Sequence, residues 1–165
     1  MIEEEWRSVP DWPSYEVSSL GRVRRLSGRF KKPTIHPKGY LRVNLHIDHD
    51  YKTMKVSRLV AAAFLPTFQN NLQVDHIDGV QTNNSVNNLR MATSSENARN
   101  KRTPRNNTSG AKGVARLDNC FRAQIQVNRK NICLGRFSTL EEAINCRREA
   151  ELKYFGEFVR RSAAE

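Results

Sequence analysis

The sequence has few cysteines and no long apolar stretch, and each absence excludes a class of protein. Its 165 residues contain no run near the ~20 apolar residues that a membrane-spanning helix needs, and residues 1–5 are acidic where a secretory signal would be basic. The cysteines Cys120, Cys133 and Cys146 are odd in number and form neither a CxxC metal motif nor a disulfide framework. We therefore expect no membrane partner, no zinc, and reduced thiols in a cytoplasmic protein.

Acidic residues are also scarce. There are 28 Lys and Arg residues against 17 Asp and Glu residues, which gives a formal net charge of +11. The excess is concentrated in two stretches without any acid, residues 21–42 with eight basic residues and residues 99–116 with six. One basic stretch is often only a solvated surface, but two in so small a protein indicate a polyanionic partner, most often nucleic acid.

Composition divides the chain into modules. Residues 100–110, NKRTPRNNTSG, contain no apolar side chain and have the composition of a linker. We place a basic linker at residues 102–111, between two N-terminal modules, residues 1–55 and 56–101, and a C-terminal module, residues 112–165.

The C-terminal module has the pattern of a sheet with one polar face. Apolar and polar side chains alternate over residues 121–128, and residues 112–117 and 132–137 are predicted to complete a three-stranded antiparallel sheet. A polar face can simply be exposed to solvent, but Arg and Gln also form bidentate hydrogen bonds with guanine and adenine edges. The candidate DNA contacts on or near this face are Arg116, Arg122, Gln124, Gln126, Arg129 and Arg136.

One helix is predicted after this sheet. Ser138 and Glu141 have the spacing of a capping box, and Gly156 provides the stop. The whole stretch, from the Gly113-Val pair through LGRF to the closing Phe-Gly, resembles the Apetala/ethylene-response-factor type of DNA-binding domain. The resemblance implies a sheet that enters the major groove of double-stranded DNA. Phe121 stands where that family often has Trp.

The central module carries the most informative pattern. Residues 56–65 are predicted to form a short apolar helix that Pro66 ends. Predicted strands at residues 74–77 and 89–91 enclose a polar loop, and a capping box at residues 93–96 starts another helix. This is a strand, loop, strand, helix sequence within about thirty residues.

Three residue types in this module suit phosphodiester cleavage. Asp75 and Asn97 offer hard oxygen ligands for Mg²⁺ or Mn²⁺, and His76 is a natural general base near neutral pH. Neighbouring strand residues point to opposite faces, so a local distortion must bring Asp75 and His76 to one phosphate. A second Asp-His pair, in residues 46–50, is expected to form a hairpin turn and not to bind metal.

The full pattern VDHIDG, NNLR and SEN resembles the HNH nucleases, particularly phage homing endonucleases in which the last His is Asn. The resemblance implies a ββα-metal (His-Me finger) fold with His76 as the catalytic base and Asp75 and Asn97 as metal ligands. Asn88 would be the middle Asn, which pins the loop by hydrogen bonds. Ser57 occupies the place of a His that is frequent in the family's preceding helix.

The first module mixes aromatic residues with short β-type segments. Its string WRSVP, YEVSSLGRVRRL resembles the small DNA-binding module fused to HNH homing nucleases. The aromatic residues are expected to form a small core rather than to stack on bases. The resemblance implies that Gly21 and the arginines beside it lie against DNA. The candidate contacts in this module and in the linker are Arg22, Arg24, Arg25, Lys101 and Arg102.

The sequence therefore predicts an α+β chain of small modules, with a central nuclease motif and a C-terminal three-stranded sheet plus one helix. Its predicted function is metal-dependent, sequence-directed cleavage of double-stranded DNA by a monomer, as nicks or double-strand breaks with 5′-phosphate and 3′-hydroxyl ends. A phage-encoded protein of this type would act in the host cytoplasm. The alternative is a DNA-binding transcriptional regulator with a silent HNH module. RNA is the weaker partner, because A-form RNA lacks an open major groove.

Overall fold

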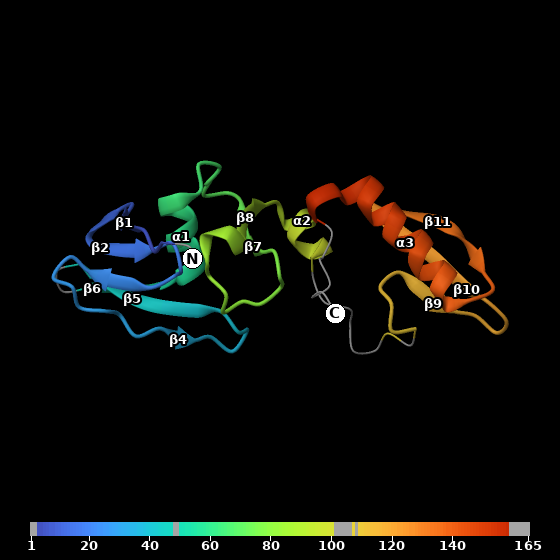
Figure 1. The fold of residues 1–165 in the computed structure, drawn as a ribbon, viewed down its shortest axis with the longest axis horizontal. Coiled ribbons are helices and arrows are strands. Elements are labelled where there is room, and N and C mark those ends of the chain that lie inside the picture. Colours follow the sequence, from blue (N-terminus) through green and yellow to red (C-terminus); the bar gives the residue numbers. More distant parts are fainter. Residues whose placement is uncertain (1–2, 48–49, 101–106, 108, 159–165) are drawn as a thin grey trace. The chain divides into compact units, whose positions relative to one another are not determined.

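The structure is a computed structural model that describes residues 3–47, 50–100, 107 and 109–158. The chain forms two compact units, one ending at Ala98 and one beginning at Arg99, which we describe separately (Figure 1). In the described part of the chain, no helix is both long enough and apolar enough to cross a membrane.

The first unit is built from three antiparallel sheets and two short helices. The first sheet has the order β1-β2-β3, the second β4-β5-β6, and β7 pairs with β8. The elements are β1 (Trp6–Val9), β2 (Trp12–Ser18), β3 (Val23–Arg25), β4 (Thr34–Ile35), β5 (Leu41–Ile47), β6 (Asp50–Lys55), α1 (Val56–Phe64), β7 (Gln73–His76), the 3₁₀ turn η1 (Val86–Asn88), β8 (Leu89–Ala92) and α2 (Ser94–Arg99).

One hydrophobic core joins the sheets of this unit. The helix α1 supplies Val56, Leu59 and Val60, which pack with residues of β2, β5 and β8. The sequence analysis places a module boundary between residues 55 and 56. In the structure, one hydrophobic core contains residues from both sides of that position. The physical reason is that α1 buries its apolar side chains against sheets that precede it and follow it in the chain. The fully buried Tyr15 and Val17 confirm that part of the aromatic segment forms a core.

Tyr15 ties β2 to β5. Its hydroxyl accepts a hydrogen bond from the backbone N–H of His46 at 2.9 Å. We expect Tyr15→Phe to lower the free energy of unfolding by about 0.5–1.5 kcal/mol, because it removes the hydrogen bond by which a fully buried tyrosine ties β2 to β5. The measurement is urea unfolding of the full chain. The matched control is Tyr51→Phe, at a 59% exposed tyrosine, where a change below about 0.5 kcal/mol is expected. Equal midpoints for all three proteins would contradict this role.

The second unit has the predicted architecture of a three-stranded antiparallel sheet with one helix. Figure 1 shows α3 running across this sheet, whose strand order is β11-β10-β9. Val114, Ala123, Ile125 and Ala143 are buried between them. The elements are β9 (Val114–Arg116), β10 (Phe121–Val127), β11 (Lys130–Phe137), α3 (Leu140–Phe155) and the 3₁₀ turn η2 (Gly156–Phe158).

The capping box of α3 lies one residue later than predicted. Thr139, not Ser138, is the N-cap, and its hydroxyl accepts from the backbone N–H of Glu142 at 3.2 Å. The Glu142 carboxylate accepts in return from the N–H of Thr139. The sequence STLEE contains the capping-box spacing twice, once from Ser138 to Glu141 and once from Thr139 to Glu142. Thr139 has the extended backbone of an N-cap, so the second pair forms the box. Gly156 ends the helix with a φ of 51°, as predicted.

Candidate active site and nucleic-acid interface

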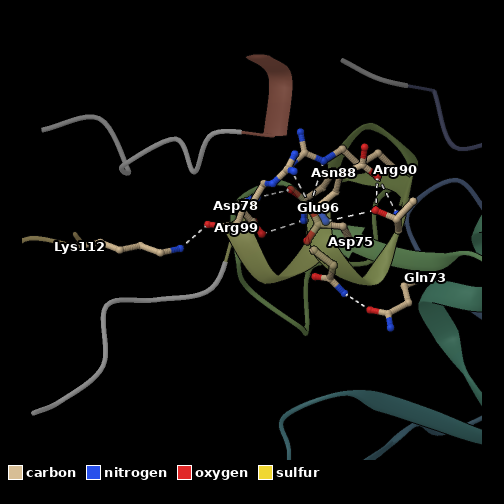
Figure 2. Close-up of polar contacts among 10 residues, drawn as sticks. Gln73, Asp75, Asp78, Asn88, Arg90, Glu96, Arg99 and Lys112 are labelled. Atoms are coloured by element: carbon tan, nitrogen blue, oxygen red, sulfur yellow. Dashed lines mark hydrogen bonds and ion pairs between the residues drawn. The ribbon is translucent and has the colours of Figure 1, made fainter. Parts of the chain in front are cut away.

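Asp75 lies at the centre of the two-stranded sheet and is held by an arginine. It is only 3% exposed, and Arg90 stands directly opposite on β8. The Nε and Nη2 atoms of Arg90 donate to Asp75 Oδ2 at 2.9 and 2.8 Å (Figure 2). This pair stabilises a buried carboxylate, which supplies the negative charge of the candidate site.

His76 ends β7 and is oriented by Asn84. The ring is 5% exposed, and its Nε2 lies 3.1 Å from Asn84 Oδ1. Asn84 Nδ2 donates to the carbonyl of Thr82 at 3.1 Å, so Oδ1 is the Asn84 atom that faces the ring. We therefore assign the hydrogen to Nε2, which makes Nδ1 the ring nitrogen that can accept a proton.

The surroundings of His76 keep its imidazole neutral. Burial lowers the pKa of His76 below its usual value. The hydrogen bond to Asn84 and the charges of nearby carboxylates raise the pKa, but they do not overcome burial. A neutral imidazole at neutral pH is the form that accepts a proton.

The turn between β2 and β3 of the first sheet packs against Asn84 and its neighbours. A Cβ at Gly21, where φ is +86°, would come within 2.7 Å of the Asn84 Cβ. In addition, the N–H of Val86 donates to the carbonyl of Ser19 at 2.8 Å. The turn between β2 and β3 therefore packs directly on the loop that orients His76. Gly21, which the sequence associates with DNA, has a packing role here.

The loop between β7 and β8 is closed by hydrogen bonds between Asp78 and Asn88. The N–H of Asp78 donates to Asn88 Oδ1 at 3.0 Å, and Asn88 Nδ2 donates to Asp78 Oδ1 at 2.9 Å (Figure 2). Burial raises the pKa of Asp78, but hydrogen bonds from Val80, Asn83 and Asn88 together outweigh it and lower the pKa. The loop is therefore held by a charged carboxylate.

Asn97 lies in the first turn of the short helix α2, as predicted. Thr93 and Glu96 cap that helix as predicted, with Glu96 Oε2 accepting from the N–H of Thr93 at 2.8 Å. Asn97 Nδ2 donates to Gln73 Oε1 at 2.7 Å. This hydrogen bond engages the amide nitrogen of Asn97 and leaves its oxygen as the atom that could bind a metal ion. Across the part of the chain that the structure describes, no group of three or more His, Cys, Asp and Glu side chains forms a metal site.

A basic groove of about 600 Å³ lies on the first unit. Among the described residues, five cations and no acid line this groove. The lining residues are Arg25, Arg29, Phe30, Lys31, Lys32, Thr34, Arg42, Asn44 and His46. Of the three arginines proposed from sequence in this module, only Arg25 lines the groove. Arg22 and Arg24 are ion-paired with Glu4 and Glu16 and lie over the Trp6 ring.

The groove cations that sequence reasoning did not select are Arg29, Lys31, Lys32 and Arg42. They all belong to the acid-free stretch of residues 21–42, so the signal was present in the sequence. The hairpin expected at residues 46–50 is formed by β5 and β6, while Asp48 and His49 lie outside the described residues. Lys101 and Arg102 lie outside them as well.

The open face of the C-terminal sheet carries most of the predicted contacts. Arg122 stands opposite Arg136, and Gln124 stands opposite Cys133. These positions alternate with Ala123 and Ile125, which are buried under α3. Two arginines face each other without an acid between them, and Arg122 Nε is buried without a hydrogen-bond partner. Opposed like charges are unfavourable, so this face favours an anionic partner.

Arg116 requires a correction. The sequence places it on the open face, but it pairs with Phe121, and directly opposed residues share a face. Counting from the buried Val114 with a period of two puts Arg116 on the helix side and Ala115 on the open side. Arg129 lies in the hairpin turn between β10 and β11, with a φ of 65°.

Comparison with known proteins identifies the family of this chain. A family profile described as the NUMOD4 motif matches residues 4–46, and one described as an HNH endonuclease matches residues 54–99. DNA endonuclease I-HmuI of Bacillus phage SP01 is 36% identical over 118 residues, which cover 70% of this chain and 68% of that protein. The chain therefore belongs to the HNH homing endonuclease family, whose members are DNA endonucleases.

A solved structure of I-HmuI and one further relative extend the comparison. The solved structure "DNA binding and cleavage by the HNH homing endonuclease I-HmuI" has a TM-score of 0.54 and 38% identity, and the match covers 57% of this chain and 55% of that one. The protein named "SPbeta prophage-derived putative HNH homing endonuclease YosQ" of Bacillus subtilis (strain 168) is 34% identical, with 59% of this chain and 55% of that protein matched. These two matches each cover 55% of the other chain, so the similarity spans little more than half of the solved chain and of YosQ.

Proposed function

We propose that this chain is a divalent-metal-dependent, sequence-directed endonuclease that hydrolyses double-stranded DNA at a centre formed by His76, Asp75 and Asn97. The observation that carries this proposal is the buried His76, whose Nε2 is held by Asn84 while Asp75 lies next to it in the chain. A neutral imidazole that is held in place can accept a proton from an attacking water, and the carboxylate of Asp75 can bind a divalent metal ion.

The chain's own residues would act as follows. Nδ1 of His76 takes the proton from the attacking water, and Asn84 keeps the ring in the required tautomer and orientation. Asn88 and Asp78 hold the loop that carries Asn84. As water attacks phosphorus, the bond between phosphorus and the 3′ oxygen breaks. The 3′ oxygen takes a proton from solvent and becomes the 3′-hydroxyl, while the phosphate stays on the 5′ end of the other fragment.

The donor set fits a hard divalent cation. Asp75 offers a carboxylate and Asn97 an amide oxygen, and Gln73 occupies the amide nitrogen of Asn97. Mg²⁺ and Mn²⁺ prefer such oxygen ligands, and Mg²⁺ typically uses one or two protein ligands with water and phosphate oxygens completing the shell. When bound, the ion supplies positive charge to the phosphate and the leaving oxygen.

Two surfaces would hold the DNA. The basic groove of the first unit would contact phosphates, and the open face of β10 and β11 would read base edges, as in the Apetala/ethylene-response-factor type of domain that this module resembles. We propose that the protein acts as a monomer in the cytoplasm of a phage host. One centre per chain then predicts one nick per binding event.

The test of this function is cleavage of supercoiled DNA that contains the preferred site. We expect nicked or linear product with Mg²⁺ or Mn²⁺, and no product when a chelator is present in excess. Tight binding without cleavage, across both metals and a library of sites, would instead support the DNA-binding regulator.

The groove leads to a prediction about salt. Replacing Lys31 and Lys32 with alanine removes two phosphate contacts, so the slope of log K against log salt should become shallower by about 2. The loss of affinity should be the same for all DNA sequences. The matched control is Lys153→Ala on α3, which is exposed and does not line the groove. An unchanged slope for the double variant would contradict phosphate binding in the groove.

The open sheet face leads to a prediction about sequence choice. Arg122→Ala, Gln124→Ala and Gln126→Ala should each cost ~1–3 kcal/mol of discrimination at particular base pairs while the module stays folded. Binding-site selection on each variant measures this effect, with Asn145→Ala on the exposed side of α3 as the control. Bound DNA should also slow alkylation of Cys133, which is exposed opposite Gln124. Selected sites identical to those of the parent would contradict base reading by this face.

A further inference from the structure

The first unit has a second pocket, which is separate from the basic groove and from the loop that orients His76. Its volume is about 250 Å³, and it shares one residue, Asn97, with the proposed centre. The ring of Tyr40, another of its walls, lies 6.0 Å from the His76 ring. The lining residues are Tyr40, Lys55, Ser57, Arg58, Leu72, Gln73, Val74 and Asn97.

The pocket carries uncompensated positive charge. Lys55 Nζ lies 4.5 Å from the centre of the Tyr40 ring, and no carboxylate in the described part of the chain forms an ion pair with it. Partial burial lowers the pKa of Lys55, and three nearby cations lower it further. These cations are Arg42, Arg58 and Lys38. An anion in the pocket would relieve this repulsion.

The first turn of α1 adds hydrogen-bond donors at the same place. Lys55 is the N-cap residue, no side chain caps the helix, and its first turn contains no acid. The first-turn amides and the positive end of the helix dipole are therefore available to an anion. Ser57 is only 3% exposed and lines the pocket, and its hydroxyl has no hydrogen-bond partner among the described residues.

The far wall of the pocket is fixed in place by Arg58. Its Nη1 donates to the carbonyl of Leu72, and its Nη2 donates to the carbonyl of Asn70, both at 2.9 Å. These contacts anchor the segment that leads into Gln73 and Val74, the other residues of that wall. The guanidinium is thus engaged with the backbone, which makes Lys55 and Ser57 the groups that address a ligand.

We propose that this pocket binds the DNA phosphate that is cleaved, with Lys55, the Ser57 hydroxyl and the first-turn amides of α1 holding its non-bridging oxygens. The proposal rests on the endonuclease function proposed above. Asn97 links the two sites, because it lines the pocket and is also the amide ligand of the proposed centre. Lys55 would then stabilise the negative charge that develops on the phosphate oxygens as water attacks.

The test compares Lys55→Gln with the parent chain in single-turnover cleavage of the preferred site. We expect the rate to fall by about a hundredfold, since a donor to the transition-state charge is lost. Lys55→Arg should recover most of the rate, and Ser57→Ala should lower it about tenfold. Binding is measured separately in a His76→Ala background, where Lys55→Gln should change Kd by less than about threefold.

The matched control is Lys52→Gln, which removes an exposed lysine from the same strand, β6, outside the pocket. If the parent and this control cleave but Lys55→Gln cleaves equally fast, the phosphate site is wrong while the endonuclease function stands. Weaker binding with an unchanged rate would also overturn the proposal, because it would mean a phosphate away from the cleaved bond. No cleavage by the parent would instead refute the endonuclease function.

Discussion

His76→Ala should lower the single-turnover rate of DNA cleavage by about 10²–10⁴-fold at pH 7.5 and leave the dissociation constant for DNA nearly unchanged. The attacking water loses its base, whereas the groove cations and the open face of β10 and β11 remain. The measurement is cleavage at saturating protein, with DNA binding measured in parallel.

Two controls make this result specific to the base. Because His76 is 5% exposed and hydrogen-bonded, thermal unfolding must show that the variant remains folded. His36→Ala removes a histidine of the same unit that lies outside the β7–β8 loop, and it should cleave at the parent rate. Cleavage by His76→Ala at the parent rate would contradict the assigned base.

Asp75→Asn should lower the cleavage rate by about 100-fold or more at ordinary Mg²⁺, because it removes the only charged ligand assigned to the ion. Asparagine is chosen over alanine because its side-chain oxygen can still accept a hydrogen bond from Arg90, so the contact between β7 and β8 is kept. Excess chelator should abolish cleavage by the parent, and added Mg²⁺ should restore it.

The control for this variant is Asp50→Asn. Asp50 is exposed at the start of β6, so the substitution changes the net charge equally without touching the centre. We expect that control to cleave like the parent, and Asn97→Asp to retain activity because it keeps an oxygen ligand. Full activity of Asp75→Asn, or cleavage in excess chelator, would rule out the assigned metal site.

Local patterns were sufficient to predict many of the elements of the fold, although not the individual strands β1 to β4. Alternation over β10 and a stop at Gly156 identified the second unit, because a one-sided sheet and a capped helix are defined by neighbouring residues. The capping box at Thr93 and the β7, loop, β8 order were predicted for the same reason. The boundary at residues 55 and 56 was not a boundary of the core, since burial of α1 depends on partners distant in the chain.

The supporting contacts of the site could not be predicted from sequence. Asn84 lies in a loop without periodicity, and nothing in its position indicates that it would meet His76. Charge counting could not distinguish Arg25, which lines the groove, from Arg22, which is neutralised by Glu4. Arg116 was placed on the wrong face because β9 has only three residues, too few to establish an alternation.

The most direct test of the central claim follows the oxygen of the attacking water. Cleavage of the preferred site with Mg²⁺ is carried out in water enriched in oxygen-18, under single-turnover conditions, and the fragment ends are analysed by mass spectrometry. Hydrolysis at the His76 centre predicts one solvent oxygen in the new 5′-phosphate and none in the 3′-hydroxyl. Solvent oxygen in a 3′-phosphate, or product ends without any solvent oxygen, would contradict the account.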